Sequence, residues 1–175
     1  YQRLKAKKMK NNLQFDFIVD KEKNTLSIVR EFNAERQLVW DCYTKQELLD
    51  QWFAPKPFTT KTKSMDFSNG GHWHYAMVDP EGTEYWGYTE YHDINPIDYY
   101  RTMDAFCDSE AKINEDLPRA KWLVAFNDKG KNSTVTTVVT YDSLNDLETI
   151  TNMGMEEGMI ATLEKLDELL ATLKK

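Results

Sequence analysis

The carboxy-terminal stretch SLNDLETITNMGMEEGMIATLEKLDELLATL, residues 143–173, decides the fold. Ser143 with Asp146 has the pattern of a helix-capping pair, and the apolar spacing that follows is helical. The sequence predicts one long helix that ends near Leu173, roughly 26 residues and about 39 Å long. One stripe of this helix is apolar, and the opposite side is acidic. The stripe is Met155, Met159, Leu163, Leu166, Leu170 and Leu173, flanked by Leu169 and Thr162, and the acidic side is Glu157, Glu164 and Glu168.

A helix with such a stripe needs a covering surface, and the preceding sequence supplies strands. Residues 13–32 alternate apolar and polar side chains around a polar turn, a pattern typical of a β-hairpin. Further on, short runs rich in Val, Thr, Tyr, Trp and Phe are separated by Gly-, Pro-, Asn- and Asp-containing turns. We expect these runs to be the strands of a meander, at residues 58–67, 72–78, 83–94, 98–106, 119–126 and 133–141.

Two short helices are predicted between the hairpin and the meander. Asn33 is a suitable N-cap for the first, and Thr44 with Glu47 forms a capping box for the second. The second helix must end before Pro55. We therefore expect an α+β protein in which a curved antiparallel sheet wraps around the long carboxy-terminal helix, with two short helices after the first strands.

The chain of 175 residues is long enough for one domain with a substantial core, and no linker or internal repeat divides it. Residues 1–11 form a basic tail that we expect to be disordered or foreign to the native protein, with Met9 as the initiator. Residues 12–175 are then a single domain. We expect no signal peptide and no membrane span, because no apolar run approaches the roughly 20 residues that a span needs.

The charge of the chain argues against polyanionic partners. There are 22 basic and 29 acidic residues, and residues 1–10 hold five of the basic ones, which leaves 17 against 29, or −12. Such a surface repels phosphate backbones, so we expect no nucleic-acid partner. Cys42 and Cys107 lack metal-ligand spacing, and we expect buried, reduced thiols in a cytoplasmic protein.

Several stretches, taken in order from about residue 13, resemble one family. They are Ile28–Trp40 (IVREFNAERQLVW), Trp52–Pro55 (WFAP), Gly70–Trp73 (GGHW), Met77–Gly82 (MVDPEG), Thr102–Phe106 (TMDAF) and Gly154–Leu166 (GMEEGMIATLEKL). The chain resembles the SRPBCC superfamily, whose START-like or birch-pollen-allergen-like members share the helix-grip fold. Within it, the chain is similar to the branch named for the carboxy-terminal domain of the heat-shock-protein-90 ATPase activator.

The resemblance implies a deep cavity between helix and sheet that takes lipids, hormones, polyketides or other apolar molecules. The branch often has a second tryptophan where Phe53 stands and an aromatic residue where Met159 stands. These departures imply a cavity of altered shape.

We expect the amino-terminal half of the long helix to form one wall of this cavity. Residues 154–162 are less bulky or more adaptable than the leucines that follow them. Opposite them, the alternation along residues 72–78 points Trp73, Tyr75 and Met77 inward. Ten residues are candidates to line the cavity, although plain core packing explains them about as well. They are Trp52, Phe53, Trp73, Tyr75, Met77, Tyr91, Met103, Trp122, Met155 and Met159.

The same alternation points His72 and His74 outward and side by side. No Cys, Asp or Glu nearby completes a recognisable ligand set, so we expect solvated imidazoles and no metal site. The chain contains no nucleotide-binding, zincin or serine-hydrolase motif, and we expect no cofactor.

Three residues are candidates for catalysis: Glu156 at the edge of the apolar stripe, Asp104 in the TMDAF run, and Arg30 on the first strand pair. A carboxylate beside an apolar cavity can have a raised pKa suited to proton transfer, whereas an ion pair at the rim is the simpler interpretation. Met153 and Ile160 interrupt the polar side of the helix and could mark a homodimer contact.

Three hypotheses for function follow. The first is a protein that binds a hydrophobic small molecule or lipid between the carboxy-terminal helix and the sheet. The second is an enzyme resembling polyketide cyclases or hydratases, which uses the polar groups at the cavity. The third is an interaction module that stimulates a chaperone ATPase, as the namesake of the branch does. The lining of the space between helix and sheet distinguishes the first two from the third.

Overall fold

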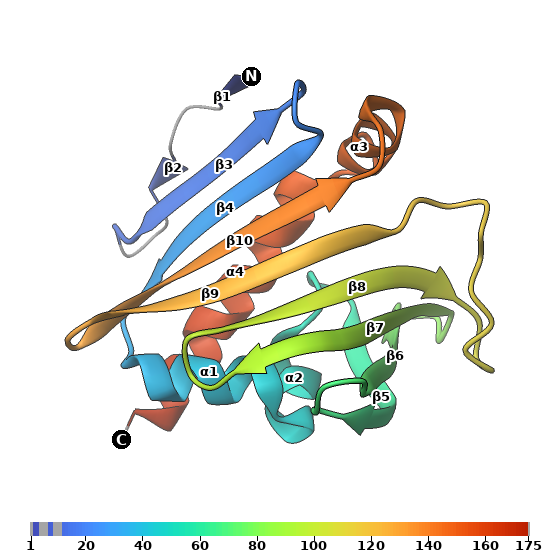
Figure 1. The fold of residues 1–175 in the computed structure, drawn as a ribbon. Helices are drawn as coiled ribbons and strands as arrows, with labels where there is room; N and C mark the ends of the chain where they lie inside the picture. The colour runs from blue at the N-terminus through green and yellow to red at the C-terminus, as the bar shows by residue number, and fades with distance from the viewer. Residues whose placement is uncertain (1, 4–6, 9–11, 175) are drawn as a thin grey trace.

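The computed structural model describes residues 2–3, 7–8 and 12–174 (Figure 1). The strands are β1 (Gln2–Arg3), β2 (Lys7–Lys8), β3 (Gln14–Asp20), β4 (Thr25–Phe32), β5 (Thr59–Asp66), β6 (His72–Val78), β7 (Glu84–Asn95), β8 (Tyr99–Cys107), β9 (Ala120–Lys129) and β10 (Asn132–Tyr141). The helices are α1 (Arg36–Thr44), α2 (Gln46–Trp52), α3 (Leu144–Thr151) and α4 (Met155–Leu173).

The strands form one antiparallel sheet in the order β1-β3-β4-β10-β9-β8-β7-β6-β5, with β2 also paired to β3. Strands β5 to β10 are neighbours in sequence order, so they are the predicted meander. Because β10 also pairs with β4, the first hairpin continues the same sheet. Helix α4 crosses one face of this curved sheet, while α1 and α2 lie near one of its ends and α3 near the other (Figure 1). The predicted α+β architecture is confirmed.

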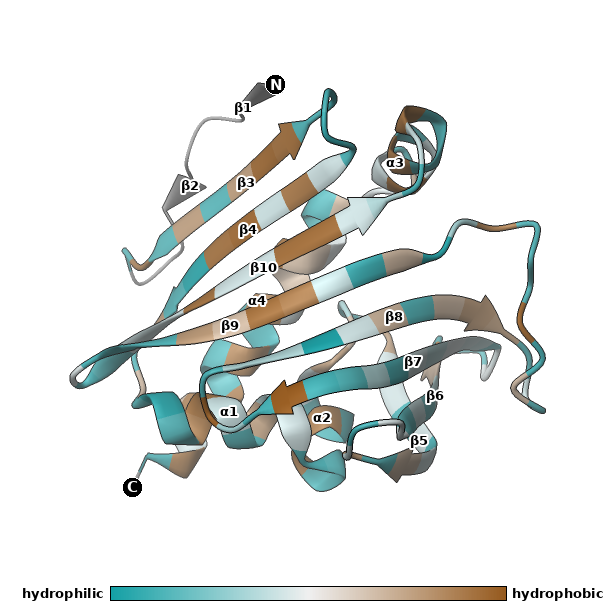
Figure 2. Ribbon diagram, viewed as in Figure 1, coloured by the Kyte–Doolittle hydropathy of each residue, from teal (hydrophilic) through white to brown (hydrophobic). Residues whose placement is uncertain are grey.

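Period-two patterning decides which face of the sheet is the core. Along β4 every second residue is buried, and apolar and polar bands alternate along β3, β4 and β10 in Figure 2. The predicted strands of the meander agree with the observed bounds to within three residues at each end. The agreement is close because turn residues separate the runs, as where Gly130 adopts a φ of 77° between β9 and β10.

The two short helices occur where predicted, but both predicted N-caps are wrong. The N-caps are Glu35 and Lys45, and neither side chain makes a capping hydrogen bond. The hydroxyl of Thr44 instead donates to the backbone oxygen of Trp40 at 2.8 Å, four residues earlier in the last turn of α1. Helix α2 ends at Trp52, before the prolines, as predicted.

The predicted long carboxy-terminal helix is present as α4, but its predicted start at Ser143 is wrong, because a break in the chain separates α3 from α4. The cap at Ser143 is confirmed, since its hydroxyl accepts from the Asp146 amide at 3.0 Å. The break falls at residues 152–154, where Gly154 has a φ of 84°, a left-handed conformation that glycine adopts without strain. Helix α4 therefore has 19 residues, about 28 Å at 1.5 Å per residue.

The apolar stripe of α4 is graded along its length. Its carboxy-terminal half is closed, with Leu163, Leu166 and Leu170 each no more than 3% exposed, whereas Met155 and Met159 pack against the core and stay partly accessible. Leu173, at the last residue of the helix, is 39% exposed. The leucine half of the helix is structural packing, as predicted, except at this end.

A buried ion pair fastens α4 to β4. Arg30 is 1% exposed, and its guanidinium donates to the carboxylate of Asp167 and to the backbone oxygen of Glu31. The same guanidinium lies over the ring of Phe32, 4.9 Å from its centroid. Because an unpaired charge in the core is costly, Asp167 is what allows Arg30 to lie there.

Both cysteines are free, with Cys42 buried and Cys107 half-buried. Burial raises the pKa of the Cys42 thiol to about 12 and that of Cys107 to about 11. No helix in the described ranges is both long and apolar enough to cross a membrane. The expectation for the basic tail falls largely on residues 1, 4–6 and 9–11, which lie outside the described residues.

The ion pair gives a testable prediction. Asp167→Ala leaves Arg30 charged without its carboxylate partner in the core, so we expect the free energy of unfolding to fall by about 3–5 kcal/mol. Glu168→Ala is the control, because it removes the neighbouring carboxylate, 3.2 Å from Lys56 Nζ in an exposed pair, at a cost of about 1 kcal/mol or less. Urea unfolding followed by circular dichroism measures both, and equal losses would contradict the assignment.

Candidate functional site

The inner face of β6 carries the predicted aromatic residues. Trp73 and Tyr75 stack with ring centroids 4.0 Å apart, and the indole nitrogen of Trp73 donates to the Thr62 hydroxyl at 3.0 Å. Trp73 is buried, while Tyr75 and Met77 are partly accessible. This strand therefore supplies a rigid aromatic pair to the interior.

A glycine on the next strand makes room for Tyr75. Gly87 pairs with Tyr75 across β6 and β7, and a Cβ at Gly87 would lie 2.7 Å from both Cζ and the hydroxyl oxygen of Tyr75. The hydroxyl end of the phenol ring thus lies against the backbone of β7, the strand between β6 and β8. Burial, with the charge of Asp104 as the next cause, raises the pKa of Tyr75.

The end of α2 contributes a second pair of rings. Trp52 is 1% exposed and donates from its indole nitrogen to the backbone oxygen of Cys42 at 2.9 Å. Phe53 follows it and makes edge contacts with Trp73 and Tyr75, at centroid distances of 4.8 and 5.6 Å. Phe53 is thus the link between α2 and the aromatic pair on β6, whereas Trp52 packs within the core.

Tyr91 and Trp122 lie on the inner face of the sheet, and Met103 on the outer one. Tyr91 is 2% exposed, and its ring lies 4.8 Å from that of Phe67. Met103 adjoins Asp104 on β8, so the two side chains point to opposite faces. The acid points inward to Trp122, and Met103 lines a pocket on the other side.

Asp104 is the catalytic candidate that lies in the interior beside the aromatic residues. Its Oδ1 accepts the Ala120 amide and its Oδ2 accepts the indole N–H of Trp122, both at 2.7 Å. Burial raises the pKa of the Asp104 carboxyl, and these hydrogen bonds and the charge of Arg119 oppose that rise. The acid is therefore held in one orientation within the apolar interior.

Of the other two catalytic candidates, Arg30 is not beside Asp104. In the pairing register, Arg30 lies opposite Val135 on β10, which lies opposite Phe126 on β9. The Phe126 amide donates to the backbone oxygen of Asp98, the residue before β8. Asp104 is six residues further along, so Arg30 and Asp104 are on the order of 20 Å apart at about 3.3 Å per residue. Glu156 lies in the first turn of α4 and is partly exposed.

The outward histidines differ from the prediction. Nε2 of His72 and the Ser64 hydroxyl share a hydrogen bond of 2.8 Å, and the ring of His72 stacks against that of Tyr88. His74 is only 4% exposed, because the backbone oxygen of Asp108 lies 3.0 Å from its Nε2 and covers it. The prediction of solvated imidazoles is therefore wrong for His74. Within the described ranges, no group of three or more His, Cys, Asp or Glu could hold a metal ion.

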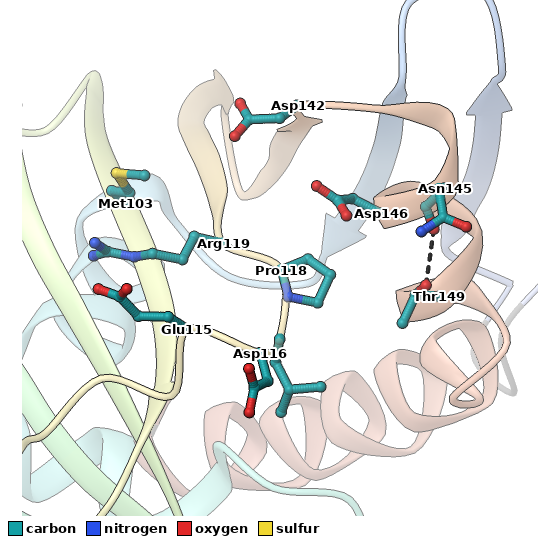
Figure 3. Close-up of a pocket in the computed structure, with 10 residues that line it drawn as sticks. Met103, Glu115, Asp116, Pro118, Arg119, Asp142, Asn145, Asp146 and Thr149 are labelled. Carbon is teal, nitrogen blue, oxygen red and sulfur yellow. Dashed lines mark hydrogen bonds between the residues drawn. The ribbon is translucent and has the colours of Figure 1, made fainter.

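A pocket of about 360 Å³ lies outside the predicted site, between the β8–β9 connection and α3 (Figure 3). Its lining is mainly polar and acidic, with Arg119 as its cation. The lining residues are Met103, Glu115, Asp116, Leu117, Pro118, Arg119, Asp142, Asn145, Asp146 and Thr149. Arg119 connects this pocket to the interior, because its Nε donates to the backbone oxygen of Asp104 at 2.9 Å.

Two residues near Asp104 were missed by the sequence analysis. Tyr141 is 5% exposed and pairs with Ala120 across β9 and β10. Alternation along residues 133–141 puts it on the same face as Val135 and Val139 and would have found it. Arg119 follows a proline in a loop, and no periodic pattern there signals its contact with Asp104.

A curved antiparallel sheet around a carboxy-terminal helix, with an apolar and aromatic inner face, defines the helix-grip class of proteins. The model of the family described as "Activator of Hsp90 ATPase homolog 1-like protein" matches residues 33–171, and the chain belongs to this family. The resemblance inferred from the ordered stretches is therefore confirmed. No curated protein sequence matches the chain.

Solved structures with the same fold are similar over nearly the whole chain. A protein from Arthrobacter aurescens is 27% identical with a TM-score of 0.84, over 89% of this chain and 91% of that one. Protein Ms6760 from Mycobacterium smegmatis is 28% identical with a TM-score of 0.82, over 89% and 95% of the two chains. A protein from Staphylococcus epidermidis is 28% identical with a TM-score of 0.78, over 90% and 95%.

The contact between Tyr75 and Gly87 gives a second prediction. In Gly87→Ala the new methyl group meets a ring that stacking on Trp73 prevents from moving away, so we expect a loss of roughly 1–3 kcal/mol in the free energy of unfolding. Gly158→Ala is the control, because nothing lies within 4 Å of its Cβ position and alanine favours the helix by roughly 0.5–1 kcal/mol. Urea unfolding compares them, and a neutral Gly87→Ala would show that Tyr75 is free to move.

Proposed function

We propose that the protein binds an apolar small molecule or lipid in the interior of the sheet, beneath the amino-terminal half of α4. One observation carries the proposal: the stripe of α4 is sealed by leucines in one half and left partly accessible at Met155 and Met159 in the other. Methionine adapts its shape to irregular space, which suits a wall that meets a ligand. The family is one whose fold commonly takes hydrophobic ligands.

The aromatic residues opposite α4 support the same site. Burial raises the pKa of Tyr75, yet this side chain keeps accessible surface. A side chain that protein largely encloses but that stays partly accessible is expected of a residue that lines a binding site. Phe53 and Trp122 are likewise partly accessible while packed against the core. Apolar and aromatic walls with a few polar groups are typical of small-molecule sites.

The distribution of polar groups favours binding over cyclase or hydratase chemistry. General acid–base catalysis needs groups that reach the same reacting atoms. Arg30 is committed to Asp167 at a distance from Asp104, and Glu156 is partly exposed in the first turn of α4. Asp104 is the charged candidate with a hydrogen bond to an aromatic residue of the inner face. We therefore assign Asp104 a role in ligand recognition. Stimulation of a chaperone ATPase stays a prediction.

A neutral fluorescent probe tests the proposal. N-phenyl-1-naphthylamine fluoresces strongly in apolar sites, so we expect its emission to rise on binding to the native protein. In Met159→Trp the indole occupies part of the proposed space, and we expect the affinity to fall at least about tenfold, or about 1.4 kcal/mol.

Met153→Trp is the matched control, because Met153 is 59% exposed and the same change there leaves the interior intact. Thermal unfolding checks that both variants are folded. If the native protein gave no rise in emission, or if the two tryptophan variants bound equally well, the proposed site would be wrong.

A further inference from the structure

The surroundings of Asp104 carry an inference about which ligands the interior accepts. Its carboxylate bridges β8 and β9, since one oxygen takes the amide of Ala120 and the other the indole of Trp122. Each carboxylate oxygen has a second lone pair, so both oxygens keep the capacity to accept from a ligand. Because these two hydrogen bonds fix its orientation, the carboxylate of Asp104 is a preorganised hydrogen-bond acceptor.

Tyrosine side chains on two other strands, each one strand removed from β8, lie on the same face of the sheet as this carboxylate. Tyr141 on β10 is the cross-strand partner of Ala120, and Tyr75 reaches over Gly87 from the other side. The charge of Asp104 is a cause of the raised pKa of each tyrosine, as expected for groups that face the same space. Acid and phenols therefore converge from three strands, β6, β8 and β10.

Neither phenol hydroxyl is satisfied by the protein. Tyr141 is 5% exposed, yet within residues 12–174 neither its hydroxyl nor that of Tyr75 makes a hydrogen bond to a side chain or to the backbone. Neither hydroxyl is fully enclosed either, because the fully buried side-chain atoms without a partner among the described residues belong to Arg30, Thr60 and Arg119, so each tyrosine hydroxyl keeps surface that a ligand can reach. Two such hydroxyls beside the preorganised carboxylate of Asp104 form a candidate polar subsite.

The cations near this subsite already have partners. Arg119 donates to the backbone oxygen of Asp104, and its Nη2 lies 3.3 Å from Glu90. Arg30 is held by Asp167. Cys107, which also influences Tyr75, has a pKa of about 11 because of burial and is a neutral thiol at pH 7. The charge that faces a ligand is therefore the negative one of Asp104.

We propose that Asp104, with the hydroxyls of Tyr75 and Tyr141, binds the hydroxyl group of an uncharged apolar ligand and excludes ligands that carry a carboxylate. A ligand hydroxyl has one hydrogen to donate to Asp104 and two lone pairs to accept from Tyr75 and Tyr141, so all three groups are satisfied. A ligand carboxylate would set two negative charges together in a medium of low dielectric constant, which is strongly unfavourable. This selection by charge rests on the proposed function, and it makes apolar alcohols and phenols the ligand class and not fatty acids.

A matched pair of probes tests the selection on the native protein. 2-Naphthalenemethanol and 2-naphthoate have the same ring system and differ in charge at pH 7.5. We expect isothermal titration calorimetry to show that the alcohol binds at least about tenfold more tightly, or about 1.4 kcal/mol.

Two substitutions assign the effect to Asp104. In Asp104→Asn the preference for the alcohol should shrink several-fold, because the carboxylate probe no longer meets a charge. Asp142→Asn removes the same charge from an exposed side chain in the outer pocket, and we expect the preference to stay unchanged. Tyr141→Phe is a second variant in case Asp104→Asn unfolds, and it should weaken binding of the alcohol alone.

The outcomes separate this inference from the function on which it rests. If N-phenyl-1-naphthylamine binds but the native protein takes the two naphthalene probes equally, or takes neither, the selection by charge is wrong and the apolar site stands. A preference that follows Asp142 would move the site to the outer pocket and also overturn the inference. If N-phenyl-1-naphthylamine itself does not bind, the proposed function fails.

Discussion

The concave face of the sheet must be covered, and α4 is the element that covers it. The leucine half of α4 does this by close packing, with Leu166 fully buried, and the ion pair between Arg30 and Asp167 fastens that half to β4. The other half begins after the break at Gly154 and meets the sheet through methionines. One half of the helix is therefore closely packed, and the other meets the core through more adaptable side chains.

In the proposed site, the polar groups of the interior lie beneath the methionine half of α4. A carboxylate and tyrosine hydroxyls are unfavourable in a closed apolar core unless they find partners, and the protein supplies partners to Asp104 through Ala120 and Trp122. The hydroxyls of Tyr75 and Tyr141 lack such partners among the described residues, which fits a site that a ligand completes. Gly87 supports the same arrangement, because a side chain at this position would collide with Tyr75.

The sequence was most informative where structure is periodic. Alternation gave the strands, their inner face and the apolar stripe of the last helix, and the ordered stretches gave the family. It failed where local patterns compete: the spacing across residues 152–154 suits a continuous helix, but Gly154 turns left-handed and ends it. Long-range contacts were also beyond it, as where the loop at Asp108 covers His74, or Arg119 meets Asp104. The separation of Met103 from Asp104, by contrast, follows from alternation alone.

We propose that an apolar ligand lies between the methionine half of α4 and the sheet. Nuclear magnetic resonance of methionine methyl groups, labelled with carbon-13 and titrated with N-phenyl-1-naphthylamine, tests it directly, because methionines report from both sides of the sheet. We predict that the methyl signals of Met155 and Met159 shift with the probe while that of the exposed Met153 does not. A shift of Met103 in the outer pocket, with Met155 and Met159 unchanged, would contradict the account.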